Sequence, residues 1–173
     1  ERAGRCVDFV TKGAKRMQSL LADLLVYAEA SGDSPVEGHS INLNTIFETV
    51  KQNCQVAIEQ SSAVVTCDRL PLIQGQEPHF VQVFENLISN AIKYRGDRAP
   101  RIHFSAERDD GGWRFAVADN GIGIAPDYHQ EIFGLFKRLH GSAVPGTGMG
   151  FAICQRVLVR YGGRIWVESL EGQ

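Results

Sequence analysis

Hydrophobic residues in the first thirty positions recur at alternating spacings of three and four, which is the pattern of one long helix. The seam that they form consists of Val7, Val10, Ala14, Met17, Leu21, Leu24 and Ala28, and Leu20 and Leu25 widen it. So wide an apolar stripe suits a helical bundle better than a two-stranded coil. A turn-rich stretch, Ser31 to Pro35, ends the helix. This apolar stripe is expected to pack against another surface, which is either the helix's own domain or, as we favour, a second copy of the helix.

The pattern becomes a mixture of helices and strands after residue 41. It predicts helices over about 44–60, 77–94 and 148–161 and strands over 64–67, 72–74 and 164–168. Two alternating runs, 101–107 and 113–119, flank Asp109-Asp110-Gly111-Gly112 and predict a β-hairpin. Because helices and hairpin strands are segregated rather than alternating, we expect an α+β fold. This fold would be a two-layer α/β sandwich preceded by the long helix, and not a doubly wound sheet.

The helix predicted over 77–94 carries an unusual polar stripe. Its apolar arc consists of Phe80, Phe84, Leu87, Ile88 and Ala91, and the opposite stripe of His79, Gln82, Asn86, Asn90 and Lys93. The stripe is either a solvated helix face or a functional one. Asparagine is a mediocre helix former, so two asparagines one turn apart favour a function. Their amide oxygens, followed by the Lys93 ammonium, suit a hard cation such as Mg²⁺ that is shared with nucleotide phosphates.

The segment from Asp119 to Ile124 reads Asp-Asn-Gly-Ile-Gly-Ile and ends a predicted strand. Asp119 shares strand parity with Trp113, Phe115 and Val117, so its carboxylate is expected on the core side. A buried carboxylate needs a donor, and the exocyclic amine of a purine would serve. Gly121 and Gly123 would let the backbone approach a flat base. The alternative is a strand-ending turn in which the aspartate bonds its own backbone.

A second glycine-rich segment, Gly146-Thr147-Gly148-Met149-Gly150, leads directly into a predicted helix. Converging backbone N–H groups and a helix N-terminus suit polyphosphate. The segment does not follow a strand in a βαβ unit and no Walker lysine follows it, which argues against Rossmann and P-loop enzymes. Between the two glycine segments, the pair Phe133 and Phe136 is expected to anchor a loop whose Lys137 and Arg138 face phosphate. Residues 141–150 have the composition of a mobile lid.

Composition narrows the class of protein. The chain has 173 residues, is 43% hydrophobic and carries a net charge of −2, which fits one compact domain with an appended element. No block of like charges is present, so contact with nucleic acid or a membrane surface is not expected. No apolar run is long enough for a membrane span. The four cysteines lie far apart and are expected to be buried thiols of a reducing, cytoplasmic compartment.

Taken in their order along the chain, these motifs resemble those of sensor histidine kinases. Residues 86–94 resemble the N-box, 119–124 the first glycine box, 133–136 the F-box and 146–150 the second glycine box. The first helix resembles the second helix of the dimerisation and phosphoacceptor domain, and 136–140 is similar to phytochrome-like kinases. The resemblance divides the chain into that helix (1–32), a linker (33–41) and a catalytic ATP-binding domain (42–173) whose final strand is truncated.

The resemblance implies a Bergerat-type fold that binds ATP and Mg²⁺. It implies that Asp119 reads the adenine amine, with Gly121 and Gly123 beneath the base, and that Asn86 and Asn90 hold Mg²⁺. The residues implied at the phosphates are Lys93, Lys137, Arg138, Gly146, Thr147, Gly148 and Gly150, with Tyr94 lining the pocket. Asn86, Lys93, Lys137 and Arg138 would be the catalytic set.

The reaction implied is phosphoryl transfer to a histidine. Related hydrolases carry a water-activating glutamate where this chain has Asn86, which cannot act as a base. None of the five histidines has the sequence context of an acceptor, so the acceptor is expected on a helix preceding residue 1 and this chain is not expected to autophosphorylate alone. The implied partners are a second copy, through the N-terminal helix bundle, and a response regulator receiver domain. The alternatives are a non-catalytic ATP-sensing module and a serine kinase or hydrolase of the same superfamily.

Overall fold

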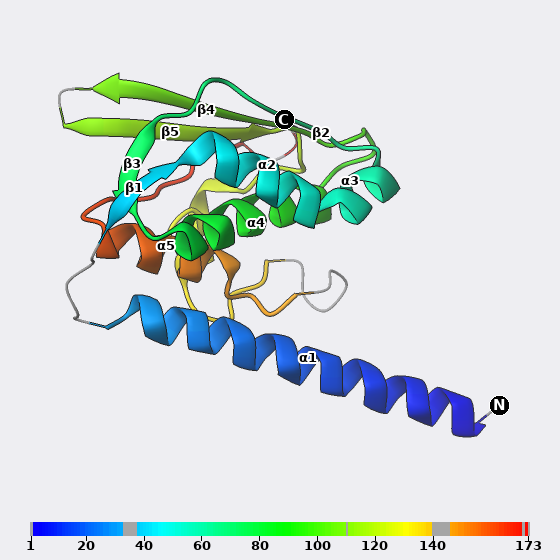
Figure 1. Cartoon of the computed structure of the whole chain (residues 1–173). Helices are drawn as coiled ribbons and strands as arrows, with labels where there is room; N and C mark the ends of the chain where they lie inside the picture. The colour runs from blue at the N-terminus through cyan, green and yellow to red at the C-terminus, as the bar shows by residue number, and fades with distance from the viewer. Residues whose placement is uncertain (1, 33–37, 110, 140–145, 171, 173) are drawn as a thin grey trace.

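The computed structural model describes residues 2–32, 38–109, 111–139, 146–170 and 172. Figure 1 shows a layer of strands facing a layer of helices, with one long helix on the far side of the helical layer. This arrangement confirms the predicted α+β sandwich preceded by a long helix. Among the described residues, no helix combines the length and the apolar character that a membrane span needs.

The strands form two small sheets. In the larger sheet, β4 (Arg101–Asp109) pairs in parallel with β2 (Val64–Cys67) and antiparallel with β5 (Gly112–Asp119), which confirms the hairpin. In the smaller sheet, β1 (His39–Asn42) pairs antiparallel with β3 (Leu72–Gly75). The prediction that residues 39–41 belong to a linker is wrong at this point; residues 33–37 lie outside the described residues. In β1, only Ile41 is buried, so its sequence shows no alternation of apolar and polar residues that would predict a strand. The strand forms because it pairs with β3.

The strand predicted over 164–168 is not formed among the described residues. Its burial still alternates, with Ile165 and Val167 less exposed than their neighbours. However, the hydrogen bonds at this end of the chain go to the loop after β5 instead of to β5 itself. Ser169 Oγ accepts from Ile124 N at 3.0 Å, and Gly172 N donates to Ile122 O at 2.9 Å. The alternating pattern predicts correctly which side chains of residues 164–168 are less exposed. It does not predict that the segment joins the sheet, because strand pairing depends on hydrogen bonds to distant residues.

In the described part of the chain, four helices form the second layer: α2 (Leu43–Asn53), α3 (Gln55–Ser61), α4 (Glu77–Lys93) and α5 (Gly150–Arg160). Two short 3-10 turns, η1 (Pro126–Tyr128) and η2 (Glu131–Phe133), follow β5. The single helix predicted over 44–60 is broken at Cys54, where φ is −90° and ψ is 3°. The packing changes at this point, because the buried residues of α2 end at Val50, whereas α3 has no fully buried residue.

The core lies between α2, α4 and the inner face of the larger sheet. Phe104 on the central strand β4 contacts Phe47 of α2 with ring centroids 5.4 Å apart and Phe84 of α4 with centroids 4.9 Å apart. Ile88, one turn further along α4, is fully buried. These contacts fix the rotation of α4 about its own axis.

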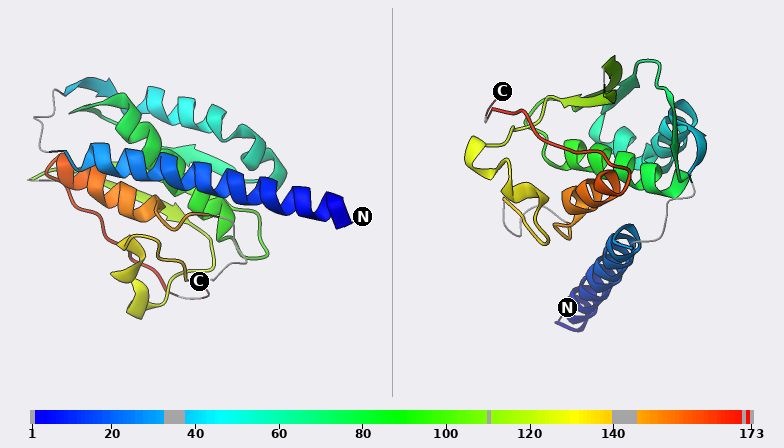
Figure 2. Two further views of the ribbon diagram at one scale, coloured as in Figure 1. Left: turned by 90° about the horizontal axis from the view of Figure 1, so that it is seen from below. Right: turned by 90° about the vertical axis from the view of Figure 1, so that its left-hand side faces the viewer.

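The long helix α1 (Arg2–Ala30) contacts the rest of the chain through α5 (Figure 2). The side that packs against the domain includes Val26, Tyr27 and the buried Ala30. The predicted seam does not take part, because Val10 is 67% exposed and Leu21 is 62% exposed. The reading in which the domain itself covers the seam is therefore wrong, because α5 contacts a neighbouring face of the helix.

A partly buried polar contact joins the start of α4 to the end of α5. The Tyr161 hydroxyl accepts from Gln76 N at 3.0 Å and lies 2.8 Å from His79 Nδ1. Burial, and then the charge of Arg160, lower the pKa of His79, while Glu29 opposes them. The neutral imidazole is therefore the form that the fold stabilises.

The pKa of His79 generates a prediction about stability in acid. Because the folded pKa lies below the ordinary value of 6.5, the unfolded chain takes up the proton first, and stability falls as the pH drops below that value. Between pH 7 and pH 5, roughly the range in which histidine titrates, the free energy of unfolding should fall more for the native chain than for His79→Gln. Urea unfolding at a series of pH values measures this difference, and parallel pH dependences would contradict the prediction.

Candidate functional site

One cleft of about 1570 Å³ lies between the helical layer, β5 and the loops that follow β5. Every residue that the sequence analysis singled out for binding lines it: Asn86, Asn90, Lys93, Tyr94, Asp119, Gly121, Gly123, Lys137, Arg138, Gly146, Thr147, Gly148 and Gly150. These residues come from four separate segments of the chain. The fold therefore gathers the predicted motifs around a single space.

The polar side of α4 faces the first turn of α5. A Cβ atom at Gly150 would lie 3.2 Å from Asn86 Oδ1 and 3.5 Å from Asn90 Nδ2. The nitrogen of the Asn86 amide is buried, and a hydrogen bond from this side chain lowers the pKa of the Cys154 thiol against the effect of burial. The amide oxygen is therefore the atom of Asn86 that lies beside Gly150 and is left for a ligand.

The side chains at this end of the cleft fit Mg²⁺ better than a transition metal. Two amide oxygens with the space kept open by Gly150 suit a hard cation that retains waters and binds phosphate. No group of three or more His, Cys, Asp or Glu side chains that could hold a metal occurs in the described part of the chain. Cys154, the buried cysteine nearest to this helix turn, is a packing residue, because burial raises the pKa of its thiol to about 12.

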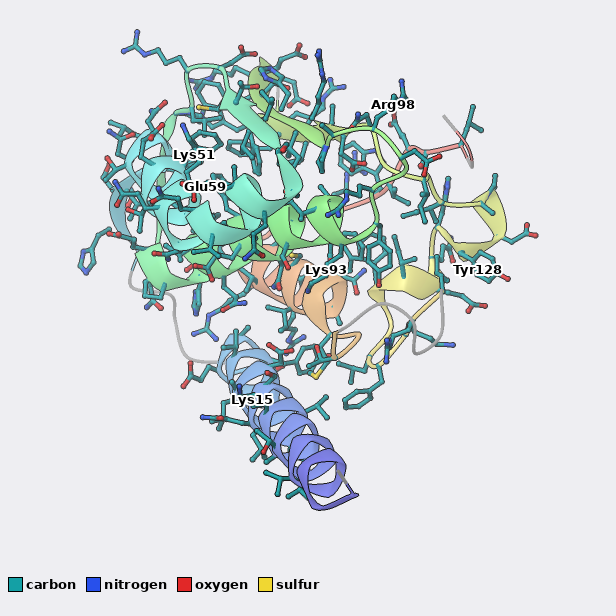
Figure 3. All side chains as sticks on the ribbon, turned by 90° about the vertical axis from the view of Figure 1, so that its right-hand side faces the viewer. Lys15, Lys51, Glu59, Lys93, Arg98 and Tyr128 are labelled. Carbon is teal, nitrogen blue, oxygen red and sulfur yellow. The ribbon has the colours of Figure 1, made fainter. Side chains whose placement is uncertain are left out.

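Lys93 ends the polar side of α4, between the ribbons of α4 and α5 in Figure 3. Burial lowers the pKa of its ammonium, and the carboxylate of Asp23 on α1 raises it again. A cation that is partly removed from water beside a cleft attracts an anion more strongly than a solvated one. This end of the cleft is therefore suited to a negatively charged ligand.

The first glycine segment is tied to the end of α4. Ile122 N donates to Tyr94 O at 2.9 Å. A Cβ at Gly121 would lie 2.8 Å from that same carbonyl and 2.7 Å from Asp119 Oδ1. Gly123 has a φ of 74°, in the left-handed region that favours glycine. Position 121 requires glycine because a side chain would collide with neighbouring atoms, and position 123 requires it because of the left-handed backbone conformation.

The carboxylate of Asp119 differs from what the sequence predicted. Its Oδ1 accepts from Gly121 N at 2.8 Å, so the strand-ending aspartate turn is present. The strand parity is as expected, since Asp119 lies opposite the buried Ile102. The side chain is nevertheless exposed, and the expectation of a buried carboxylate is wrong because β5 ends at the rim of the cleft. Oδ2 has no hydrogen-bond partner among the described residues and is free to accept a donor.

The second glycine segment packs on the loop that carries the predicted phosphate-binding cations. Gly148 has a φ of 79°, and a Cβ there would lie 2.9 Å from both the Lys137 carbonyl oxygen and the Phe136 carbonyl carbon. Lys137 Nζ lies 3.5 Å from Glu131 Oε2 in an exposed ion pair, which a phosphate would readily replace. Arg138 lines the same cleft.

Only one of the paired phenylalanines anchors this loop. Phe133 packs edge-on against Phe151, with ring centroids 5.8 Å apart. Phe136 is 57% exposed and has a φ of 60°, so the prediction that both rings anchor the loop is wrong. His140 and residues 141–145 of the predicted lid lie outside the described residues.

Asp23 on α1 is one of the polar residues of the cleft that the sequence analysis missed. Its Oδ2 accepts a hydrogen bond of 2.5 Å from the hydroxyl of Thr147. The two residues are 124 positions apart, and Asp23 shares no motif with the glycine segment. Periodicity within α1 gave no signal for this contact, because the side of the helix that meets α5 is not its apolar seam.

The packing of Gly148 generates a prediction that needs no ligand. Gly148→Ala forces a side chain into the left-handed region and against two backbone atoms, which cannot rotate away. We expect a loss of about 1–3 kcal/mol in the free energy of unfolding. Gly96→Ala is the matched control, because an added Cβ there meets nothing within 4 Å. Chemical denaturation of both variants measures the difference, and equal stabilities would contradict the described packing.

Comparison with known proteins gives two groups of relatives. The chain is 38% identical over 172 residues to cyanobacterial phytochrome A of a Nostoc species, covering 99% of this chain and 22% of that protein. It is 30% identical over 176 residues to the phosphate regulon sensor protein PhoR of Pseudomonas aeruginosa, covering 98% of this chain and 39% of that protein. The chain thus spans well under half the length of these relatives.

Solved structures agree with the fold. Full-length ShkA in complex with AMPPNP superposes with a TM-score of 0.81 at 25% identity, covering 100% of this chain and 37% of that chain. Histidine kinase ThkA in complex with the response regulator TrrA gives 0.73 at 21% identity, covering 99% of this chain and 49% of that chain, and this second likeness supports the fold alone.

The family itself is matched directly. Residues 75–173, more than half of the chain, match the histidine kinase-, DNA gyrase B-, and HSP90-like ATPases. The matched region contains all four motifs that suggested the resemblance to histidine kinases, and that resemblance is confirmed. The chain belongs to the family of histidine kinase-, DNA gyrase B- and HSP90-like ATPases.

Proposed function

We propose that this chain is the catalytic ATP-binding region of a two-component sensor histidine kinase, and that it transfers the γ-phosphoryl group of Mg-ATP to a histidine on another segment. The observation that carries the proposal is the convergence of Asn86, Asp119 and Thr147, from three separate motifs, on one cleft. The complex of the related ShkA with an ATP analogue supports nucleotide binding in a fold of this kind.

The adenine would bind at the β5 end of the cleft. Oδ2 of Asp119 would accept a hydrogen bond from the exocyclic amine of adenine, while Oδ1 continues to accept the hydrogen bond from Gly121 N. The backbone at Gly121 and Gly123 would lie beneath the base, where side chains would block the approach. Tyr94 would line the same pocket, since its carbonyl already holds Ile122.

The phosphates would bind where α4 meets the start of α5. Asn86 and Asn90 would hold Mg²⁺, which neutralises charge on the phosphates and orients them for transfer. The Lys93 ammonium would contact phosphate, and Lys137 or Arg138 would reach the terminal group. The backbone of residues 146–150, at the N-terminus of α5, would close over the phosphate chain.

The surroundings of Glu85 favour a kinase over a hydrolase. Glu85 is the carboxylate nearest in sequence to Asn86, but its Oε1 accepts from Asn53 Nδ2 of α2 at 2.7 Å. It therefore points to α2 and does not line the cleft. With an amide at position 86, neither side chain is placed to activate water. Transfer to a protein nucleophile needs positioning and charge neutralisation more than a base.

The arrangement of α1 supports the proposed division of the chain. We assign residues 1–32 to the second helix of a dimerisation and phosphoacceptor domain, the chain from β1 at His39 onward to the catalytic domain, and the segment between them to a linker. The exposed seam of α1, which includes Val7, Val10, Met17 and Leu21, would pack in a homodimeric bundle. A receiver domain of a response regulator would be the partner downstream, as the complex of ThkA with TrrA suggests by analogy.

Calorimetry of Mg-ATP binding tests the nucleotide site. Asp119→Asn removes the charge that would accept the adenine amine, and hydrogen bonds to charged groups contribute about 1.5–3 kcal/mol. The affinity should therefore fall roughly tenfold or more. Asp127→Asn is the control, because Asp127 is equally exposed and does not line the cleft. Absence of binding by the native chain, or equal affinity of the two variants, would refute the assigned site.

Phosphoryl transfer distinguishes the proposal from its alternative, a non-catalytic ATP-sensing module. With radiolabelled ATP and the phosphoacceptor domain of a phytochrome-type relative added in trans, we expect label on the acceptor that is labile to acid, as phosphohistidine is. Acid-stable label would indicate a serine kinase. Saturable ATP binding without any transfer, while a catalytic domain from that relative labels the same acceptor, would favour the sensing module.

A further inference from the structure

The helix α1 is held on the domain at two places, and the first is its C-terminal end. Arg156 donates from Nε to Ser31 Oγ at 2.8 Å and from a terminal nitrogen to Ser31 O at 3.0 Å. Arg160 donates to the carbonyls of Glu29 at 2.6 Å and Gly32 at 3.0 Å. The last carbonyls of a helix carry partial negative charge, so two guanidinium groups from α5 bind this end well.

The second place is the phosphate end of the cleft. Thr147 donates its hydroxyl proton to Asp23 Oδ2 at 2.5 Å, the short distance typical of a hydroxyl–carboxylate pair. The same carboxylate raises the pKa of Lys93, opposing the effect of burial. Asp23 is partly buried and lines the cleft. It thus accepts a hydrogen bond from a hydroxyl, and attracts electrostatically an ammonium, that the proposed function assigns to phosphate.

We propose that Asp23 sets the nucleotide affinity of the cleft by competing with the phosphates for Thr147 and Lys93, so that bound nucleotide weakens the docking of α1 on α5. This inference rests on the proposed function. The hydroxyl of Thr147 has one proton and gives it to one acceptor at a time. A carboxylate left beside the phosphates would also be repelled by their charge. Nucleotide therefore replaces Asp23 at the second glycine segment.

The competition links two parts of the chain that the sequence keeps separate. Because coupling between two binding equilibria is reciprocal, the factor by which docked α1 weakens nucleotide binding equals the factor by which nucleotide weakens docking. The arginine contacts at the other end of the interface do not involve the cleft. They would hold α1 near the domain after Asp23 has released it, so the helix pivots at its C-terminal end.

The opposite role for Asp23 makes a different prediction. If its carboxylate instead served as a third oxygen ligand for the cation between Asn86 and Asn90, removing the charge would weaken Mg-ATP binding. Competition requires that removing the charge tightens binding. The sign of the change therefore decides between the two roles.

Calorimetry of Mg-ATP binding to four forms of the whole chain tests the inference. Asp23→Asn should bind roughly fivefold more tightly or better than the native chain, the lower end of typical coupling between sites. Arg156→Gln should also tighten binding, because it weakens docking at the far end without touching the cleft. Asp127→Asn, which removes the same charge from an exposed residue outside both the cleft and α1, should change the affinity less than about twofold, within the ordinary effect of an exposed surface charge.

Hydrogen exchange supplies a second readout. Amides of residues 20–30 should exchange faster when Mg-ATP is added to the native chain, and faster in Asp23→Asn without nucleotide. Unchanged or weaker binding by Asp23→Asn, with a native chain that binds, overturns this inference alone. No binding by the native chain overturns the proposed function as well, so the two failures are distinguishable.

Discussion

The apolar side of α4 is packed against the sheet, and this contact decides where its polar side points. Phe84 meets Phe104 of β4, and Ile88 is fully buried beneath the helix. Helix geometry then places Asn86 and Asn90 on the side that faces the start of α5. Rotation of α4 by one residue would bury an amide in the core and expose a phenylalanine, which the hydrophobic effect opposes strongly. The position of the proposed phosphate-binding end of the cleft follows from the packing of the core.

The helix α5 connects the other parts of the site to this arrangement. Its first residue, Gly150, leaves little room for a side chain beside the asparagines of α4, and Gly148 leaves none beside the backbone of residues 136–137. At its other end, Tyr161 holds the start of α4 through Gln76 and His79. Arg156 lies on the side of α5 that holds α1. A change at the glycine segment therefore has a short, rigid route to the long helix.

The long helix carries two faces with different roles. Its seam of Val10, Met17 and Leu21 is exposed, whereas the neighbouring face with Asp23, Tyr27 and Ala30 meets the domain. A helix that is apolar on more than one side is typical of a bundle in which each face has its own partner. Docking on α5 leaves the seam open, so contact with the domain and contact with a second copy are geometrically compatible.

The sequence by itself determined the motifs, the order of most elements and the polar side of α4, because helical periodicity, strand alternation and glycine-rich segments are local properties. It did not determine whether residues 164–168 pair with β5, because strand pairing depends on distant bonds. It also did not determine that β1 forms, that Asp119 stays exposed at the end of its strand, or that Phe136 turns outward. The contact between Asp23 and Thr147 was decided only by the tertiary structure. It joins one polar residue of a helix to one hydroxyl of a loop, and only the packing of α1 on α5 brings the two together.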